Sequence, residues 1–138
     1  MGWFRKDRPA DIWDRPEARP EGDIEAARRI RAICDSAAAS ARKIANFAHI
    51  DPDEAARYQA ARRHAISLAR NIRDELLHDA AMRDILGLCM KANDVETAAA
   101  LASEIRAEPI RKAVMREHPY FISNAAPTPA ATPPAPRR

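Results

Sequence analysis

The length, composition and charge of this chain exclude several classes of protein. Its 138 residues include only 3 glycines and 2 cysteines, which excludes a glycine-rich phosphate-binding loop and a disulfide framework. The formal net charge is only +3, and basic and acidic side chains nearly balance within residues 23–118, unlike a typical nucleic-acid-binding domain. No stretch approaches the roughly 18 consecutive apolar residues of a membrane span, and the first nine residues lack the apolar region of a signal peptide. We therefore expect a cytoplasmic protein that does not insert into membranes.

Residues 1–22 are predicted to form an extended arm. Three prolines occur in this segment, each after an arginine, and proline biases the preceding residue away from the helical conformation. The arm nevertheless carries four large apolar side chains: Trp3, Phe4, Ile12 and Trp13. A groove on a protein partner is one surface that could cover them, because tryptophan is a frequent anchor of binding energy. The other surface is the rest of the chain, which is short of large core side chains, so that Trp13 and Phe4 would fold back over it.

Residues 23–118 show helical periodicity almost throughout, with alanine at many of the apolar positions. Apolar residues recur at alternating steps of four and three from Ile30 to Ala48, which places them on one face of a helix running from Asp23 to about Ala48. This pattern predicts an all-α fold, a small bundle of four to five helices packed mostly antiparallel. The heptad-like seam is also typical of a coiled coil, and a stripe that closes one chain can equally close a homodimer.

A second helix is predicted to begin at Asp51-Pro52-Asp53-Glu54. This run combines an acidic N-cap, a proline at the first helical position and a glutamate at the third. The next apolar set, from Met82 to Cys89, lies on a rotated face, which predicts a kink or short turn near His78 and Asp79. The buried stripe before the kink is predicted to consist of Tyr58, Ala61, Ala65, Leu68, Ala69, Ile72 and Leu76.

The remaining helices and the C-terminal extension follow from breakers and caps. Lys91-Ala92-Asn93-Asp94 indicates the end of one helix and the N-cap of the next. Pro109 then opens or kinks a last helix that ends near His118. Residues 119–138 form an extension that is predicted to be disordered from about residue 125, where alanine, threonine and proline dominate. Its last six residues match a P-x-x-P-x-R ligand pattern, although a flexible solubilising tail explains them more simply.

An arginine strip is predicted on one side of the second helix. Four arginines fall within about a third of its circumference: Arg62, Arg63, Arg70 and Arg73. Unpaired cations in such a strip are what a phosphate backbone requires. The alternative is an ion-pair face within the chain, formed with the acidic segment 74–108. Its candidate acids are Asp84, Glu96 and Glu104.

No residue pattern points to catalysis, a cofactor or a metal. Glu75-x-x-His78 has the spacing of one half of a bundle di-iron site, but the chain lacks the second copy that such a site needs. Cys34 and Cys89 fall on apolar stripes, where burial favours the thiol over the reactive thiolate. We expect both cysteines to act as small buried hydrophobes, with a buried bridge between them as the less favoured alternative.

These observations predict a non-enzymatic adaptor or regulatory protein that binds a protein partner. Trp3, Phe4, Ile12 and Trp13 would be the anchors, and the arginine strip would steer an acidic partner. The alternative is a nucleic-acid-binding accessory protein that uses the same arginine strip, for which binding would weaken steeply with salt.

Overall fold

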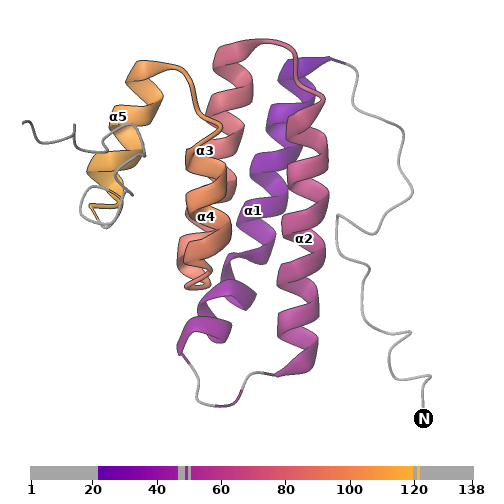
Figure 1. Cartoon of the computed structure of the whole chain (residues 1–138). Coiled ribbons are helices and arrows are strands. Elements are labelled where there is room, and N and C mark those ends of the chain that lie inside the picture. The colour runs from indigo at the N-terminus through magenta and orange to yellow at the C-terminus, as the bar shows by residue number, and fades with distance from the viewer. Residues whose placement is uncertain (1–21, 47–48, 50, 120, 122–138) are drawn as a thin grey trace, which may run out of the picture.

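A computed structural model of the chain describes residues 22–46, 49, 51–119 and 121. Within them the secondary structure consists of five helices and no strands, which confirms the all-α fold. The helices run in alternating directions (Figure 1), with α1 and α3 therefore parallel to each other. Their bounds are α1 Asp23–Asn46, α2 Pro52–Arg70, α3 Glu75–Lys91, α4 Val95–Ala102 and α5 Glu108–Glu117.

The core is centred on α3, which packs against each of the other four helices. Its large side chains Met82, Ile85 and Leu86 are fully buried, as are Ile30 and Ile33 of α1. The seam between α1 and α2 is different, because the fully buried residues there are mainly alanines. Small side chains allow two helix axes to approach closely, towards the low end of the usual range of about 8–10 Å. The alanines with no exposed surface on these two helices are Ala37, Ala41, Ala61, Ala65 and Ala69.

The break after the second helix lies earlier than the sequence predicted. We expected a kink near His78 and Asp79, but α2 ends at Arg70 and both residues lie inside α3, which begins at Glu75. The cause is Asp74, whose side chain caps the new helix by accepting a hydrogen bond from Leu77 N at 2.9 Å. The Asp23 carboxylate also accepts hydrogen bonds from the backbone N–H groups of Arg73 and Asp74, so the start of α1 holds the turn in place.

Two consequences of this break correct the sequence prediction. Leu76, predicted in the buried stripe, is 60% exposed, because the new helix starts one residue earlier and turns this side chain outward. Arg73, predicted on the second helix, lies in the turn that follows it. Ile72 is buried although it lies outside both helices, which explains why its apolar spacing resembled a continuing helix.

Asp94 joins the start of α4 to α2. Its side chain caps α4 by accepting from Thr97 N at 3.3 Å, which confirms the predicted N-cap. The same carboxylate accepts hydrogen bonds of 2.6 Å from both the Tyr58 hydroxyl and the Arg62 guanidinium. Arg62 also lies over the Tyr58 ring, 5.3 Å from its centroid. Burial raises the pKa of Asp94, but the hydrogen bonds from Tyr58, Arg62 and Thr97 outweigh it and hold that pKa below its ordinary value.

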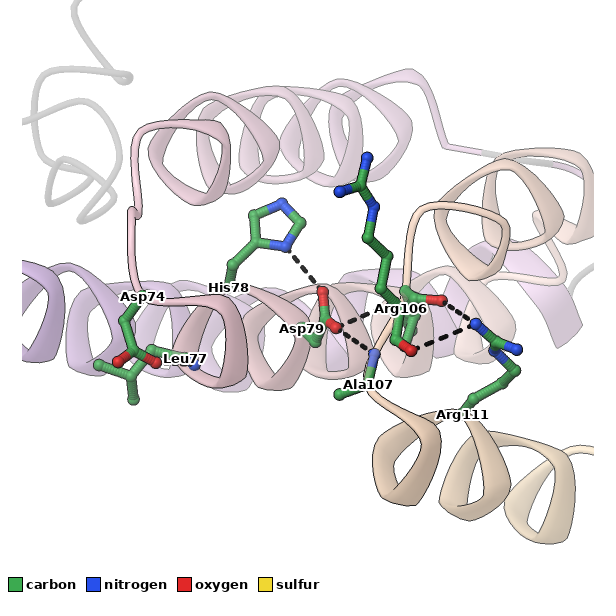
Figure 2. Close-up of polar contacts among 8 residues, drawn as sticks. Asp74, Leu77, His78, Asp79, Arg106, Ala107 and Arg111 are labelled. Carbon is green, nitrogen blue, oxygen red and sulfur yellow. Dashed lines mark hydrogen bonds and ion pairs between the residues drawn. The ribbon is translucent and has the colours of Figure 1, made fainter.

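Asp79 performs the corresponding task for α5, whose own N-cap residue, Ala107, has no side chain able to accept a hydrogen bond. Asp79 is 1% exposed and points from α3 into the turn before α5 (Figure 2). One of its oxygens accepts from Arg106 N at 2.9 Å and from Ala107 N at 2.7 Å. The other lies 2.8 Å from Nδ1 of His78. A carboxylate distant in sequence thus holds the turn from which α5 begins.

The opposite end of α5 is also attached to α3. Arg83 forms an ion pair with Glu117 through two hydrogen bonds, of which the one from Nε is 3.0 Å long. Phe121 is buried, and its ring meets that of His118 edge-on at 6.1 Å between centroids. The helix opens with Pro109 and ends before His118, as predicted.

The predicted arm and the C-terminal tail lie almost entirely outside the described residues. Trp3, Phe4, Ile12 and Trp13 are among the residues not described, as is the segment from residue 122 onward. Over the part of the chain that is described, no helix combines the length and apolar character needed to cross a membrane.

Candidate functional site: a groove between α1 and α3

A long surface groove follows the seam between α1 and α3. It consists of two hollows, of about 830 and 290 Å³, which share Arg31 and Asp84 as lining residues and therefore adjoin each other. The lining residues pair in increasing order along both helices, from Ile24 with Leu77 to Arg42 with Lys91, as expected for parallel neighbours. From residue 24 to residue 42 the groove extends about 27 Å, at the helical rise of roughly 1.5 Å per residue.

One end of the groove is largely apolar. Ile24, Ala27, Leu77, Ala80 and Ala81 line this end, together with the exposed cation Arg28. Ile24 is 62% exposed, and it and Leu76 are the exposed large hydrophobic residues among the described ones. Isolated exposed apolar side chains are normal on a protein surface, but Ile24 borders this hollow, and Leu76 lies next to Leu77, which also lines it.

The middle of the groove is bridged by one ion pair. Arg31 Nε lies 3.6 Å from the Asp84 carboxylate, joining the two walls. Burial raises the pKa of Asp84 above its ordinary value, because it outweighs the opposing effect of Arg31. The neighbouring Asp35 is exposed and makes no ion pair with any described residue. The middle of the groove therefore carries one uncompensated carboxylate, that of Asp35.

The other end of the groove is basic. Arg42 and Lys91 are exposed and form no ion pair within the described part of the chain. Arg83 and Glu117, which are paired with each other, and His118 form the wall contributed by α3 and the end of α5. Burial lowers the pKa of His118, so its imidazole is mainly neutral near pH 7. The positive charge at this end thus comes from Arg42 and Lys91.

Gly87 lines the groove in the middle of α3, where the fold does not require glycine. A Cβ atom built at this position would meet nothing within 4 Å, and the residue does not adopt the left-handed backbone conformation that favours glycine. Glycine in a helix interior costs roughly 0.5–1 kcal/mol relative to alanine. The protein therefore has a residue of low helix propensity at a position where the missing side chain leaves the groove open.

Replacing Gly87 with alanine is expected to stabilise the free protein by about 0.5–1 kcal/mol, because the helix gains propensity and the added methyl group meets no obstacle. Urea unfolding followed by circular dichroism measures the change. The matched control is Ala99→Gly on the exposed side of α4, which should lose stability by a similar amount. A loss of stability in Gly87→Ala would show that glycine is needed there for packing.

The arginine strip does not form a free basic surface. Arg62 pairs with Asp94 at 2.6 Å, and Arg70 pairs with Glu104 at 3.1 Å. Of the three acids considered as partners, Glu104 is therefore confirmed, whereas Asp84 pairs with Arg31 instead. Arg63 and Arg73 are exposed and form no ion pair within the described residues. Half of the strip is thus used to hold α2 against the segment that contains α4.

The cysteines and the Glu75–His78 pair, which the sequence analysis considered for catalysis or metal binding, do not form a reactive site. Cys34 and Cys89 are buried free thiols, and burial raises their pKa values to about 12 and about 11, which suppresses the reactive thiolate. Glu75 is exposed, whereas His78 contacts Asp79. No group of three or more His, Cys, Asp or Glu side chains within the described ranges is arranged to hold a metal ion.

The groove was not anticipated from the sequence. Its ends are formed by Ile24, Leu77, Arg42 and Lys91, which appeared only as ordinary members of amphipathic helices. Gly87, a lone glycine inside a helix, was the one signal available. Comparison of the chain with protein-family models, with curated proteins and with solved structures finds no match.

Proposed function

We propose that this protein is a non-enzymatic, cytoplasmic adaptor or regulatory protein that binds another protein. The observation that supports this proposal is the groove between α1 and α3, which has apolar side chains at one end and most of its unpaired cations at the other. Clustered apolar side chains beside charged ones are typical of protein-binding surfaces. In this proposal the arm residues Trp3, Phe4, Ile12 and Trp13 supply further anchors on the same partner.

The nucleic-acid alternative receives less support. Phosphate backbones are bound by several unpaired cations, and each neutralised phosphate releases condensed counterions. Arg62 and Arg70 already have carboxylate partners at 2.6 and 3.1 Å, so binding through the strip would have to break these ion pairs or rely on Arg63 and Arg73.

Affinity capture from extracts of the native host tests the proposal, with and without nuclease treatment. We expect a nuclease-resistant protein partner that is retained by wild type and lost from a Trp3→Ala/Trp13→Ala variant, because the variant lacks the anchoring indoles. The control is Arg63→Glu/Arg73→Glu, which alters the exposed part of the strip and should retain the partner. Partners that vanish with nuclease would support the nucleic-acid alternative and reject the protein-binding function. A nuclease-resistant partner that is lost only from the arginine variant would show that the arm does not anchor it.

A further inference from the structure

We propose that the groove between α1 and α3 binds one amphipathic helix of the partner, about 18 residues long, with acidic residues in its first turn. This inference rests on the proposed function and specifies its ligand. The groove extends about 27 Å, which is the length of about five helical turns. Its walls are two parallel helices, and a third helix laid along such a seam buries its apolar stripe between them.

Charge determines the composition of this helix. Arg28, Arg42 and Lys91 line the groove without an ion-pair partner among the described residues, against a single unpaired carboxylate, Asp35. The remaining charged pairs, Arg31 with Asp84 and Arg83 with Glu117, compensate each other. The groove therefore has an excess of positive charge, and an acidic helix complements it better than a basic one.

Helix direction follows from the position of the basic end. Arg42 and Lys91 lie near the C-terminal ends of α1 and α3, which carry the negative ends of two helix dipoles. The N-terminus of a bound helix has the opposite polarity and favours acidic residues in its first turn. The partner helix therefore lies antiparallel to α1 and α3. Its later turns then place apolar side chains between Ile24 and Leu77.

Gly87 sets how closely this helix can approach. Gly87 of α3 and Ala38 of α1 both line the groove near its basic end. Neither of these two positions carries a large side chain. Space for a Cβ atom is present but unused in the free protein. A leucine at position 87 would extend into this space and obstruct the bound helix, while the helical backbone of α3 tolerates it.

The test uses the full chain and two hydrocarbon-stapled 18-residue peptides with the same leucine stripe, one with three glutamates in its first turn and one with three lysines there. Fluorescence anisotropy measures the affinity of each labelled peptide. We expect the glutamate peptide to bind more tightly. Arg42→Glu/Lys91→Glu should weaken its binding by roughly tenfold or more, as expected for the reversal of two interfacial charges. Gly87→Leu should abolish it, and Arg63→Glu/Arg73→Glu should change it by less than about twofold.

Several results would overturn the proposal. Equal binding of the two peptides would reject an acidic helix, and unchanged binding to Gly87→Leu that remains folded by circular dichroism would reject the groove. Trp3 and Trp13 are the 2 tryptophans of the chain, and both lie in the arm. If the tryptophan fluorescence of wild type is blue-shifted relative to that of Gly87→Leu, the arm of the same chain is the occupant. A concentration-dependent dimer broken by Gly87→Leu would identify a second copy.

The same variants separate this inference from the proposed function. If the partner captured from extracts is retained by both groove variants, the protein-binding function stands and the groove assignment fails. If wild type captures no protein, the proposed function fails. The peptide measurement alone then shows whether the groove binds an acidic helix.

Discussion

Replacing Asp79 with alanine is expected to lower the free energy of unfolding by about 2–4 kcal/mol, the larger part of it through α5. The substitution removes the acceptor for the N–H groups of Arg106 and Ala107, which lie in a partly buried turn. An unsatisfied donor costs roughly 1–3 kcal/mol, and two donors lose their acceptor here. Arg111 still donates to the carbonyls of Ile105 and Arg106, so part of the turn is retained.

Urea unfolding gives the total effect, and hydrogen exchange shows where it falls. We expect the amides of α5 to lose protection more than those of α1 to α3, because few groups attach α5, among them Asp79, the Arg83–Glu117 pair and the buried Val114. The matched control is Asp74→Ala, which removes an exposed cap from the same helix as Asp79 and should cost only about 1 kcal/mol. Equal losses in the two variants would contradict a role for Asp79 in attaching α5.

Asp94→Ala is expected to lower the free energy of unfolding by a similar amount, about 2–4 kcal/mol, through the loss of three interactions. It removes the cap of α4, deprives the buried Tyr58 hydroxyl of its acceptor and leaves the half-buried Arg62 guanidinium without its carboxylate. Thermal and urea unfolding measure the loss. Asp51→Ala, which removes only a local exposed cap bond to Asp53 N, is the control and should cost about 1 kcal/mol.

Acid should reproduce part of this effect in the wild-type protein. The folded-state pKa of Asp94 lies below its ordinary value, so its contribution is complete above the unfolded pKa of about 4 and is lost as pH falls through the folded value. The plot of stability against pH should therefore be flatter below about pH 4 for Asp94→Ala than for wild type. Identical slopes would show that other carboxylates account for acid unfolding.

Local sequence signals predicted most helix boundaries. Asp51 and Asp94 accept hydrogen bonds from Asp53 N and Thr97 N, and Pro109 lies at the start of α5, because caps and breakers act within a few residues. The turn after α2 was placed too late because Ile72 is buried at a helix-like spacing although the chain there is not helical. Tertiary burial had produced the pattern that the sequence analysis assigned to a helix.

The candidate site was much less accessible to sequence reasoning. The ion pairs of α1 and α2 with the acidic segment 74–108 involve Arg31, Arg62 and Arg70. Asp79 gave no signal of its own, since its partners lie 27 and 28 residues away. The groove depends on how α1, α3 and the end of α5 are arranged in space, and no local sequence pattern encodes this arrangement.

The alanine seam between α1 and α2 is expected to be far more sensitive to larger side chains than to smaller ones. Ala37, Ala41, Ala61 and Ala65 have no exposed surface, and little can be truncated at these positions to leave a cavity. Their sensitivity lies in the opposite direction, because an added methyl or isopropyl group has to separate two closely spaced backbones. Sequence drift that preserves this bundle can therefore vary the bulky core around α3 by compensating exchanges of volume, whereas along the seam it is confined to the smallest side chains.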